Sequence, residues 1–376
     1  MKNIIYFTLS LLLFSCNANV SKNNIVNISQ DVFSSEKIIH TNNFFSNIKI
    51  IRLETNKDIL ISGIRHIYLY NNMLFIFDKE IYVFDMNGNF LNKIGTIGNG
   101  PGEFYYTPDY AAFSNNHIFL VETNLKKVSI YTLQGEYVKS FQTNLRISQL
   151  KVLNNKLLIG YITNKCGNEY NKLVTFNMEG IKIDSLKNDM IYNDFNAVIT
   201  ISHDQPMFLT EKNEIGFKDI FSDTLYTINE NLSLNPMAIF NSGDLKLKGD
   251  DVYKEPDINK ALRQSEKVLE ILFDNKNYMI LESFQTQFTC LLWDKKKNCI
   301  ENVRFLYEPE IAKYFDKEKS YMQLNPKDKS SKVMIKDGTS YFKPKYVSED
   351  NKFLIGHETS ATNEDDNPII VLAEMK

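Results

Sequence analysis

Short apolar strands, each preceded by a polar corner, recur along this chain of 376 residues. Every corner contains an asparagine and is followed at once by an apolar run, as expected for a strand that begins directly after a tight turn. Short strands in a repeat of roughly 40 residues are typical of a β-propeller, so we predict one blade for each corner. The six corners are Asn71-Asn72, Asn115-Asn116, Asn154-Asn155, Lys212-Asn213, Lys276-Asn277 and Asp350-Asn351.

Each of the first three blades is predicted to contain four strands, which in the first blade cover residues 64–70, 73–78, 81–85 and 90–94. A second series supports this alignment, because an aromatic residue stands four positions before the turn between the third and fourth strands. We expect these aromatic side chains to pack between blades rather than to stack on a ligand. They are Phe84, Tyr131, Phe176, Tyr226 and Trp293.

The last blade has only three strands at the C-terminal end of the sequence, the third being residues 369–373. Residues 46–53 alternate between polar and apolar positions and have no partner in the first blade. Docking this segment beside residues 369–373 would complete the last sheet and remove an exposed edge. We therefore predict an all-β, six-bladed β-propeller over residues 45–376, closed by an N-terminal strand.

The N-terminal residues have the pattern of an export signal. Lys2 is followed by an apolar run over residues 4–14, which is too short to span a bilayer as a mature helix. Leu13-Phe14-Ser15-Cys16 resembles a bacterial lipobox, although Phe14 departs from its usual small residue. We predict a lipoprotein signal peptide over residues 1–16 with lipidation at Cys16, and an ordinary secretory signal remains the alternative. Residues 17–44 begin with an Asn- and Ser-rich stretch and are predicted to be a flexible tether.

The segment from Ile94 to Phe104 has the sequence IGTIGNGPGEF and is followed by Pro108. It resembles the signature of the NHL repeat, as does Glu122-Thr123-Asn124 in the next blade. With the lipobox, the mature chain is similar to the exported six-bladed β-propeller lipoproteins of Gram-negative anaerobes. This resemblance implies the fold and the export but no particular reaction.

Insertions fall in one class of connection. The turns between first and second and between third and fourth strands are short, whereas the other connections lengthen. Because turns alternate between the two faces of a propeller, we predict one face with long loops around the mouth of the central channel. The main insertions are near residues 241–266 and 307–344, with helical stretches predicted over 256–267 and 308–314, and further ones lie near 162–170, 187–205 and 357–367.

The starts of the first strands would line this mouth with mixed charges and aromatic rings, which suits a polar ligand such as a glycan or a short peptide. The chain's net charge of −3 and the lack of a basic arm argue against nucleic acid as a partner. We predict a monomer whose ligand-binding residues are Arg65, His66, Asp109, Tyr110, Arg146, His203, Asp204, Lys345 and His357.

Carboxylates also stand near the ends of the second strands. Asp78, Glu122 and Asp219 each lie six residues after their corner asparagine, and Glu282 and Glu358 are one position off this register. They could hold a divalent cation, but such residues commonly accept hydrogen bonds from the next loop, which is the role that we favour. No zinc, calcium or nucleophile-elbow motif is present, so we assign no catalytic residue, metal or cofactor.

The sequence thus predicts an exported, membrane-anchored binding protein on the periplasmic or cell-surface side of the outer membrane. Two alternatives stay open: a hydrolase or lyase of the lactonase type that uses channel carboxylates and a divalent cation, and a scaffold in a membrane protein complex. Cys290 and Cys299 flank one hairpin, and the spacing does not decide between a disulfide and two free thiols.

Overall fold

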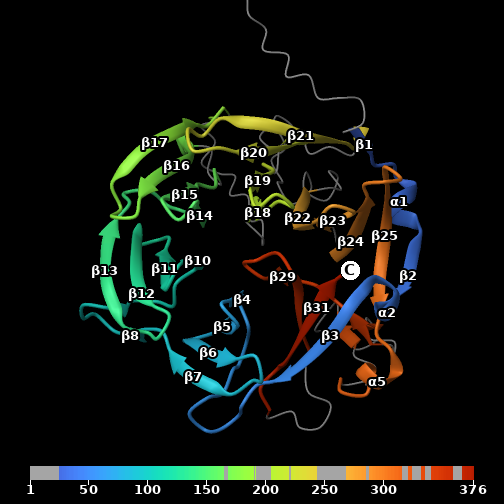
Figure 1. The fold of residues 1–376 in the computed structure, drawn as a ribbon, viewed down its shortest axis with the longest axis horizontal. Coiled ribbons are helices and arrows are strands. Elements are labelled where there is room, and N and C mark those ends of the chain that lie inside the picture. The colour runs from blue at the N-terminus through green and yellow to red at the C-terminus, as the bar shows by residue number, and fades with distance from the viewer. Residues whose placement is uncertain are drawn as a thin grey trace, which may run out of the picture.

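The computed structural model describes residues 25–164, 168–189, 191, 205–219, 222–243, 268–284, 288–315, 321–323, 332–334, 340–358 and 366–376. In these residues six sheets stand in chain order around a central axis (Figure 1). The chain is therefore a six-bladed β-propeller, as the sequence predicts.

Each blade has four antiparallel strands, counted from the channel outward. Blade 1 consists of β4 (His66–Tyr70), β5 (Met73–Phe77), β6 (Ile81–Asp85) and β7 (Phe90–Lys93). Blade 2 consists of β10 (Tyr110–Ser114), β11 (His117–Glu122), β12 (Lys127–Thr132) and β13 (Tyr137–Gln142). Blade 3 consists of β14 (Gln149–Leu153), β15 (Leu157–Tyr161), β16 (Asn171–Asn177) and β17 (Lys182–Lys187). Blade 4 consists of β18 (Met207–Leu209), β19 (Ile215–Phe217), β20 (Thr224–Ile228) and β21 (Leu234–Asn241). Blade 5 consists of β22 (Val268–Asp274), β23 (Tyr278–Phe284), β24 (Phe288–Asp294) and β25 (Cys299–Leu306). Blade 6 consists of β29 (Tyr346–Val347), β30 (Phe353–Glu358), β31 (Ile369–Met375) and β3 (Phe45–Arg52). Shorter strand pairs are β8 (Thr96–Ile97) with β9 (Glu103–Phe104), β26 (Tyr321–Gln323) with β27 (Lys332–Met334), and β28 (Tyr341–Phe342) on β25.

The predicted closure is confirmed, because β3 pairs antiparallel with β31 as the outermost strand of blade 6. Lys49 lies opposite Leu372 and Ile51 lies opposite Ile370. Ile51 is buried among apolar residues of blades 6 and 1, so the N-terminal strand joins the two ends of the ring.

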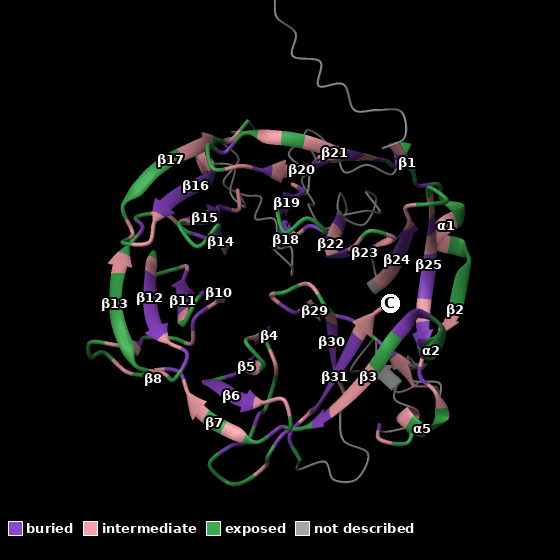
Figure 2. Cartoon of the chain, in the orientation of Figure 1, coloured by how far each residue is buried: buried purple, intermediate pink, exposed green. Residues whose placement is uncertain are grey.

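The segment before β3, which we call the strap, wraps the outer rim of blades 4 and 5. It consists of β1 (Ile25–Asn27), α1 (Asp31–Ser34), β2 (Glu36–His40) and α2 (Thr41–Phe44). β1 pairs parallel with β21, and β2 pairs parallel with β25. Figure 2 shows the contrast with blades 2 and 3, whose uncovered outer strands β13 and β17 are largely exposed.

The prediction of a flexible tether over residues 17–44 is therefore wrong from residue 25 onward. Val26 and Ile28 alternate with polar residues, and both are buried against blades 4 and 5 beside Trp293. Burial of every second residue is the pattern of a β-strand that is added to the edge of a sheet. The polar composition of the segment conceals this pattern in the sequence. Residues 17–24 lie outside the described part of the chain.

Six apolar clusters form the core, one between each pair of neighbouring blades. The aromatic residues before the outer turns pack in these clusters, as predicted: Phe84, Tyr131, Phe176 and Trp293 are buried, and Tyr226 is half-buried. Burying one such ring contributes about 1.5–3 kcal/mol to stability. Side-chain packing is thus the main link between neighbouring blades.

The asparagine corners explain how the ring is fixed on the face with short turns. Asn71 has a φ of 49° and Asn72 a φ of 58°, the left-handed conformation that asparagine tolerates better than most residues. Polar groups at the corners also join every blade to the next. These contacts are Tyr70 Oη to Asn115 O, Ser114 Oγ to Asn155 Oδ1, Asn154 Nδ2 to Glu230 Oε1, Glu211 N to Asp274 Oδ2, Asn351 Nδ2 to Asp274 O and Glu349 N to Leu69 O, at 2.6–3.1 Å.

The long connections lie between second and third strands and between blades, as the sequence predicts. One of them does not surround the channel mouth. The predicted helix after residue 308 is α5 (Pro309–Ala312), and it packs at the outer rim, where the guanidinium of Arg52 in β3 lies 5.2 Å from the centre of the Tyr314 ring (Figure 1). The stretch predicted as helix over 256–267 lies outside the described residues.

Candidate functional site

Four ring side chains from three blades gather where the inner strands begin, on the face with long loops. We call them the mouth cluster: His66, Tyr110, Tyr346 and His357. The His66 ring lies 5.2 Å from Tyr110 and 6.3 Å from Tyr346, between centroids, and Tyr346 stacks on His357 at 6.5 Å. All four are half-buried, so each presents part of its surface to solvent.

Residue spacing explains why these rings meet. His66, Tyr110 and Tyr346 each stand five residues before a corner asparagine with positive φ, namely Asn71, Asn115 and Asn351. Since the corners lie at one level of the ring, residues at equal distance from them reach the same level at the other end of the strands. Gln149 occupies the same position before Asn154, which also has a positive φ.

A contact across the channel bounds the mouth. Gln205 Nε2, just before the first strand of blade 4, lies 3.4 Å from His66 Nδ1 in blade 1, which is the opposite blade. Beside it, the Gln149 side chain is buried and exchanges two hydrogen bonds with the backbone of Met207, at 2.7 and 2.8 Å. Blades 3 and 4 are therefore fixed to each other at this level.

A second contact across the channel lies at the opposite end. Lys151 Nζ in blade 3 is 3.2 Å from the carboxylate of Glu349 at the corner of blade 6. Because blades 3 and 6 are opposite, this ion pair spans the ring near the short-turn face. The ion pair therefore couples two opposite blades at this end of the channel.

Positive charge lies at the edge of the mouth. Arg65 is exposed, and its guanidinium donates hydrogen bonds to Asp78 O at 3.2 Å and Pro108 O at 3.5 Å. Lys345 is also exposed, and its Nζ lies 3.5 Å from His357 Nε2. Burial, with the nearby Lys345 charge, lowers the pKa of His357 to about 4, so this imidazole is neutral at physiological pH.

A carboxylate pair lies beside Lys345 in blade 5. Glu270 and Glu282 are directly opposite each other on β22 and β23, so both side chains project to the same face of the sheet. Burial raises the pKa of Glu282 to about 7, and the opposing effect of Lys345 does not cancel this. Burial likewise raises the pKa of Tyr346 to about 12, with a smaller contribution from Glu282.

The structure thus brings together four of the predicted ligand-binding residues, namely His66, Tyr110, Lys345 and His357, with Arg65 beside them. Asp109 accepts a hydrogen bond from Thr123 N at 2.9 Å, so its carboxylate fixes the next loop. Arg146 is exposed, and no contact between described residues joins it to the mouth cluster. His203, Asp204 and the lipidation site Cys16 lie outside the described residues.

Three of the strand-end carboxylates are held by protein groups, but not in the way that we favoured: Asp78 accepts from the loop that precedes its blade rather than the one that follows its strand, and Glu122 and Asp219 form ion pairs. Asp78 accepts a hydrogen bond from Ser62 N at 2.8 Å, Glu122 pairs with Lys127 at 2.7 Å, and Asp219 pairs with Lys172 at 2.9 Å. Sequence reasoning missed Gln149, Gln205, Glu270, Lys151 and Glu349. The five-residue spacing before a corner could have identified Gln149, whereas the cross-channel contacts depend on blades far apart in sequence.

The described residues contain no group of three or more His, Cys, Asp or Glu side chains arranged to hold a metal ion. Cys290 and Cys299 are free thiols, because Cys290 lies opposite Val303 and Cys299 lies opposite Asp294. Burial raises the pKa of the Cys290 thiol well above its usual value, which makes this sulfur unreactive.

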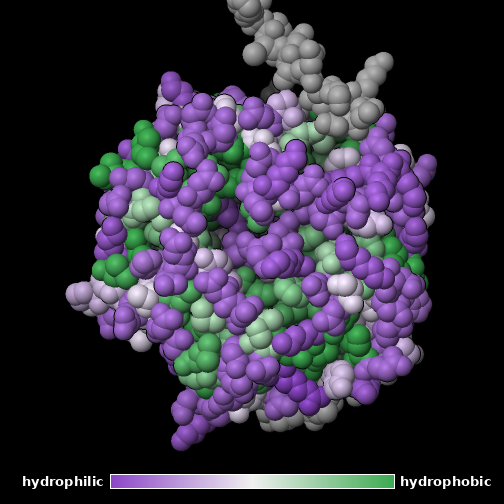
Figure 3. All heavy atoms as spheres, viewed as in Figure 1, coloured by the Kyte–Doolittle hydropathy of each residue, from purple (hydrophilic) through white to green (hydrophobic). Residues whose placement is uncertain are grey.

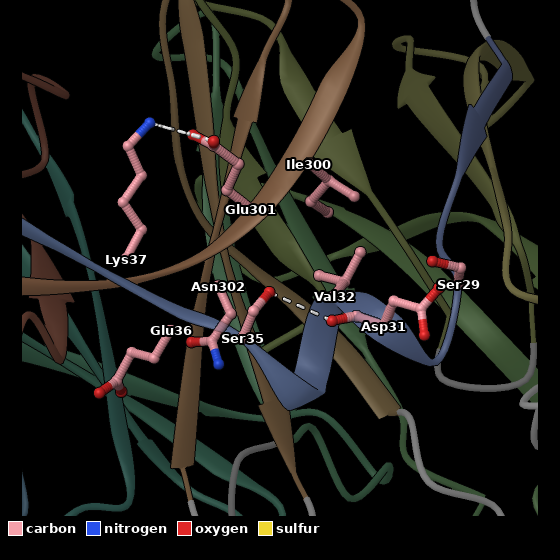
Figure 4. Close-up of a pocket in the computed structure, with 9 residues that line it drawn as sticks. All are labelled: Ser29, Asp31, Val32, Ser35, Glu36, Lys37, Ile300, Glu301 and Asn302. Atoms are coloured by element: carbon pink, nitrogen blue, oxygen red, sulfur yellow. Dashed lines mark hydrogen bonds and ion pairs between the residues drawn. The ribbon is translucent and has the colours of Figure 1, made fainter.

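A separate hollow of about 290 Å³ lies at the outer rim, between the strap and β25 (Figure 4). Its walls are joined to each other by Lys37 Nζ, which lies 2.8 Å from Glu301, and within the strap Ser35 Oγ donates to Asp31 O. Glu36 is also paired, with Arg304 at 2.8 Å. These contacts hold the strap on β25, and the hollow follows from the way α1 crosses the rim.

The family model described as "Domain of unknown function (DUF4934)" matches residues 23–374. The chain belongs to the DUF4934 family. Its fold is similar to that of BF0058 from Bacteroides fragilis NCTC 9343, which is described as exported, with 15% identity and a TM-score of 0.64 over 94% of this chain and 99% of that one. No curated protein sequence matches this DUF4934 chain.

Two further solved structures are more distant. A member of the DUF4221 family from Bacteroides vulgatus ATCC 8482 has 10% identity and a TM-score of 0.45, covering 88% of this chain and 97% of that one. A streptogramin B lyase has 11% identity and a TM-score of 0.41, covering 89% and 100%. At these identities the likeness concerns the fold alone. In the part of this DUF4934 chain that the structure describes, no helix has the length and apolar character needed to cross a membrane.

Proposed function

We propose that this DUF4934 protein is an exported, lipid-anchored binding protein that takes a polar ligand, a glycan or a short peptide, at the mouth cluster. The single observation that carries the proposal is a continuous series of four partly exposed rings from three blades, each in contact with the next. Flat rings with polar edges bind ligands that combine apolar faces with hydroxyl or amide groups.

The charges around the cluster support a polar ligand. Arg65 and Lys345 are exposed and offer hydrogen-bond donors, while neutral His357 offers both a donor and an acceptor. Figure 3 shows one face of the ring, on which hydrophilic residues gather over the middle, so polar character at the channel is not confined to the side chains named above. An apolar ligand would have to displace water from these groups without replacing their hydrogen bonds, which costs free energy.

Binding is tested with the full chain in detergent, screened against oligosaccharides and short peptides by thermal shift and then by calorimetry. A ligand at a hundred times its dissociation constant stabilises the protein by about 2.7 kcal/mol. Tyr110→Ala and Tyr346→Ala are expected to weaken binding of any hit at least tenfold, with Tyr170→Ala as a control on another blade. If Tyr110→Ala and Tyr346→Ala both bind the ligand with the affinity of the wild type, the proposal is wrong.

Export and anchoring are proposed from the signal-like N-terminus and agree with the description of BF0058 as exported. Replacing Cys16 with alanine should move the protein from the membrane fraction to the soluble fraction and abolish incorporation of a labelled fatty acid. A Cys16→Ala variant that still carries the label would show that Cys16 is not the attachment site.

An acid–base reaction is a second candidate, favoured by Glu282 alone. A carboxylic acid with a pKa of about 7 can donate and accept protons at neutral pH, and Glu270 lies directly opposite it. If the protein turns over a ligand found in the screen, the rate should fall at least a hundredfold in Glu282→Gln. Equal rates in the two proteins would exclude Glu282 as the acid or base.

A further inference from the structure

A second pair of rings lies on the connection between blades 1 and 2. Tyr105 and Tyr106 are 54% and 66% exposed, and their ring centroids are 4.6 Å apart at an interplanar angle of 89°. They belong to none of the apolar clusters between the blades. Two neighbouring tyrosines that stay this exposed contribute little to folding, since ring burial is the usual source of that stability.

The connection that carries these rings is fixed on both sides of them. Before the pair, Phe104 is buried against Tyr131, and Glu103 accepts a hydrogen bond from Gly100 N at 2.6 Å. After it, Thr107 Oγ1 donates to Lys79 O, and Pro108 O accepts from the Arg65 guanidinium. Because the loop is already ordered, a ligand that stacks on these rings would lose little binding free energy to ordering it.

The pair is close to the mouth cluster along the chain. Tyr106 is four residues before Tyr110, so their Cα atoms are at most about 14 Å apart. The segment that joins them is fixed to the mouth, because Pro108 O accepts a hydrogen bond from Arg65, which directly precedes His66. A ligand that fills the mouth and also reaches this pair must be extended, and longer than a single sugar or amino acid.

The surroundings favour a glycan over a protein surface. A protein hot spot places aromatic anchors in a packed, desolvated pocket, whereas the side chains around this pair are polar. They include Thr107 and Asp109 in the same connection, and Thr107 contacts the backbone of Lys79. Sugars present apolar C–H faces to a ring and hydroxyls to neighbouring polar groups, so this combination matches their chemistry.

We propose that Tyr105 and Tyr106 form an outer subsite of the mouth and that the ligand is a linear oligosaccharide that reaches both. This inference rests on the proposed function and names its ligand class. Affinity should rise with the length of the oligosaccharide until the chain covers both groups of rings, and then stay constant.

The test uses the full chain in detergent and linear oligosaccharide series of two to eight units (β-1,4-gluco-, α-1,4-gluco-, β-1,4-manno- and β-1,4-N-acetylgluco-), with calorimetry as the readout. For the series that binds, Tyr105→Ala/Tyr106→Ala should weaken the longest oligosaccharide at least tenfold and leave the shortest unchanged. Tyr110→Ala should weaken both. Tyr170→Ala is the matched control, because Tyr170 is 58% exposed on another blade.

The outcomes separate the two proposals. If the double variant binds long oligosaccharides as tightly as the wild type while Tyr110→Ala loses them, the outer subsite is wrong and the mouth site stands. If peptides bind at the mouth and no oligosaccharide does, the ligand class is wrong and the mouth site stands. If Tyr110→Ala and Tyr346→Ala bind like the wild type, the mouth site itself is wrong.

Discussion

Lys151 and Glu349 join opposite blades across the centre of the ring, with Nζ 3.2 Å from the carboxylate. Both side chains are mostly buried, and Glu349 also donates its backbone N–H to Leu69 O in blade 1. One residue at the corner of the last blade therefore contacts blades 1 and 3, which couples the closing blade to the opposite side of the propeller.

Removing one partner of this ion pair should destabilise the whole ring. Lys151→Met leaves Glu349 partly buried without its countercharge, so the free energy of unfolding should fall by about 1–3 kcal/mol in urea titration. The control is Lys352→Met, which breaks an exposed pair with Asp350 and should cost less than about 0.5 kcal/mol. Equal effects in the two variants would show that the cross-channel pair adds no coupling.

The Asn351 corner allows its two contributions to be separated. Its φ is 57°, and its side-chain amide donates to Asp274 O at 2.6 Å. Asn351→Gly keeps the turn and loses the hydrogen bond, whereas Asn351→Ala loses both. Alanine should therefore lower stability more than glycine does, by about 1 kcal/mol. A glycine variant as damaging as alanine would assign the whole effect to the hydrogen bond.

The strap should behave as part of the propeller. Val26 is fully buried between blades 4 and 5, so Val26→Asp should lower the free energy of unfolding by about 3 kcal/mol, as expected for an unpaired charge in a core. Ile38 is 53% exposed on β2, and Ile38→Asp should have little effect. Chemical denaturation with intrinsic fluorescence measures both, since Trp293 packs in the same cluster as Val26. If Val26→Asp left the free energy of unfolding unchanged, the prediction of a flexible tether would be supported instead.

The raised pKa of Glu282 gives stability a defined pH dependence. The folded protein holds this proton up to about pH 7, whereas an unfolded glutamate releases it near its ordinary value of 4.5. This contribution to stability is therefore complete below pH 4.5 and is lost as pH rises to about 7, amounting to about 3 kcal/mol. Glu282→Gln should remove this pH dependence. The stability of the variant relative to the wild type should therefore increase as pH rises. A constant difference between pH 4.5 and 8 would contradict this.

His357 acts in the opposite direction. Its folded pKa is about 4 and its ordinary value is 6.5, so the unfolded chain binds a proton between these values and the folded chain does not. Its contribution is complete above pH 6.5 and is lost as pH falls through about 4. In His357→Gln the melting temperature should therefore depend less steeply on pH between 4 and 6.5. An unchanged slope would show that burial does not keep the imidazole neutral.

The architecture could be predicted from the sequence because its signals are local. A corner asparagine, a short apolar strand and an aromatic residue before the outer turn each lie within one blade, and their repetition reveals the ring. Closure by β3 could be predicted because a blade with three strands needs a fourth. The strap was missed because two buried residues, Val26 and Ile28, carry its pattern in a polar segment.

The site could be predicted only where one strand carries the information. His66 and Tyr110 follow from their place at the start of an inner strand, as does Lys345 beside Tyr346. Gln205 and Glu349 contact residues in opposite blades, and no spacing within a repeat indicates which side chains meet across a channel. The burial that raises the pKa of Glu282 and the Lys345 charge that opposes it likewise depend on tertiary packing, which the spacing within a repeat does not reveal.

The most direct test of the account is hydrogen–deuterium exchange of the full chain with and without a saturating ligand from the oligosaccharide and peptide screen. The account predicts slower exchange at the starts of the inner strands, in residues 64–68, 108–112 and 343–347, and no change in the corners of the short-turn face. Protection confined to those corners or to the strap, with the mouth unchanged, would contradict a binding site on the long-loop face.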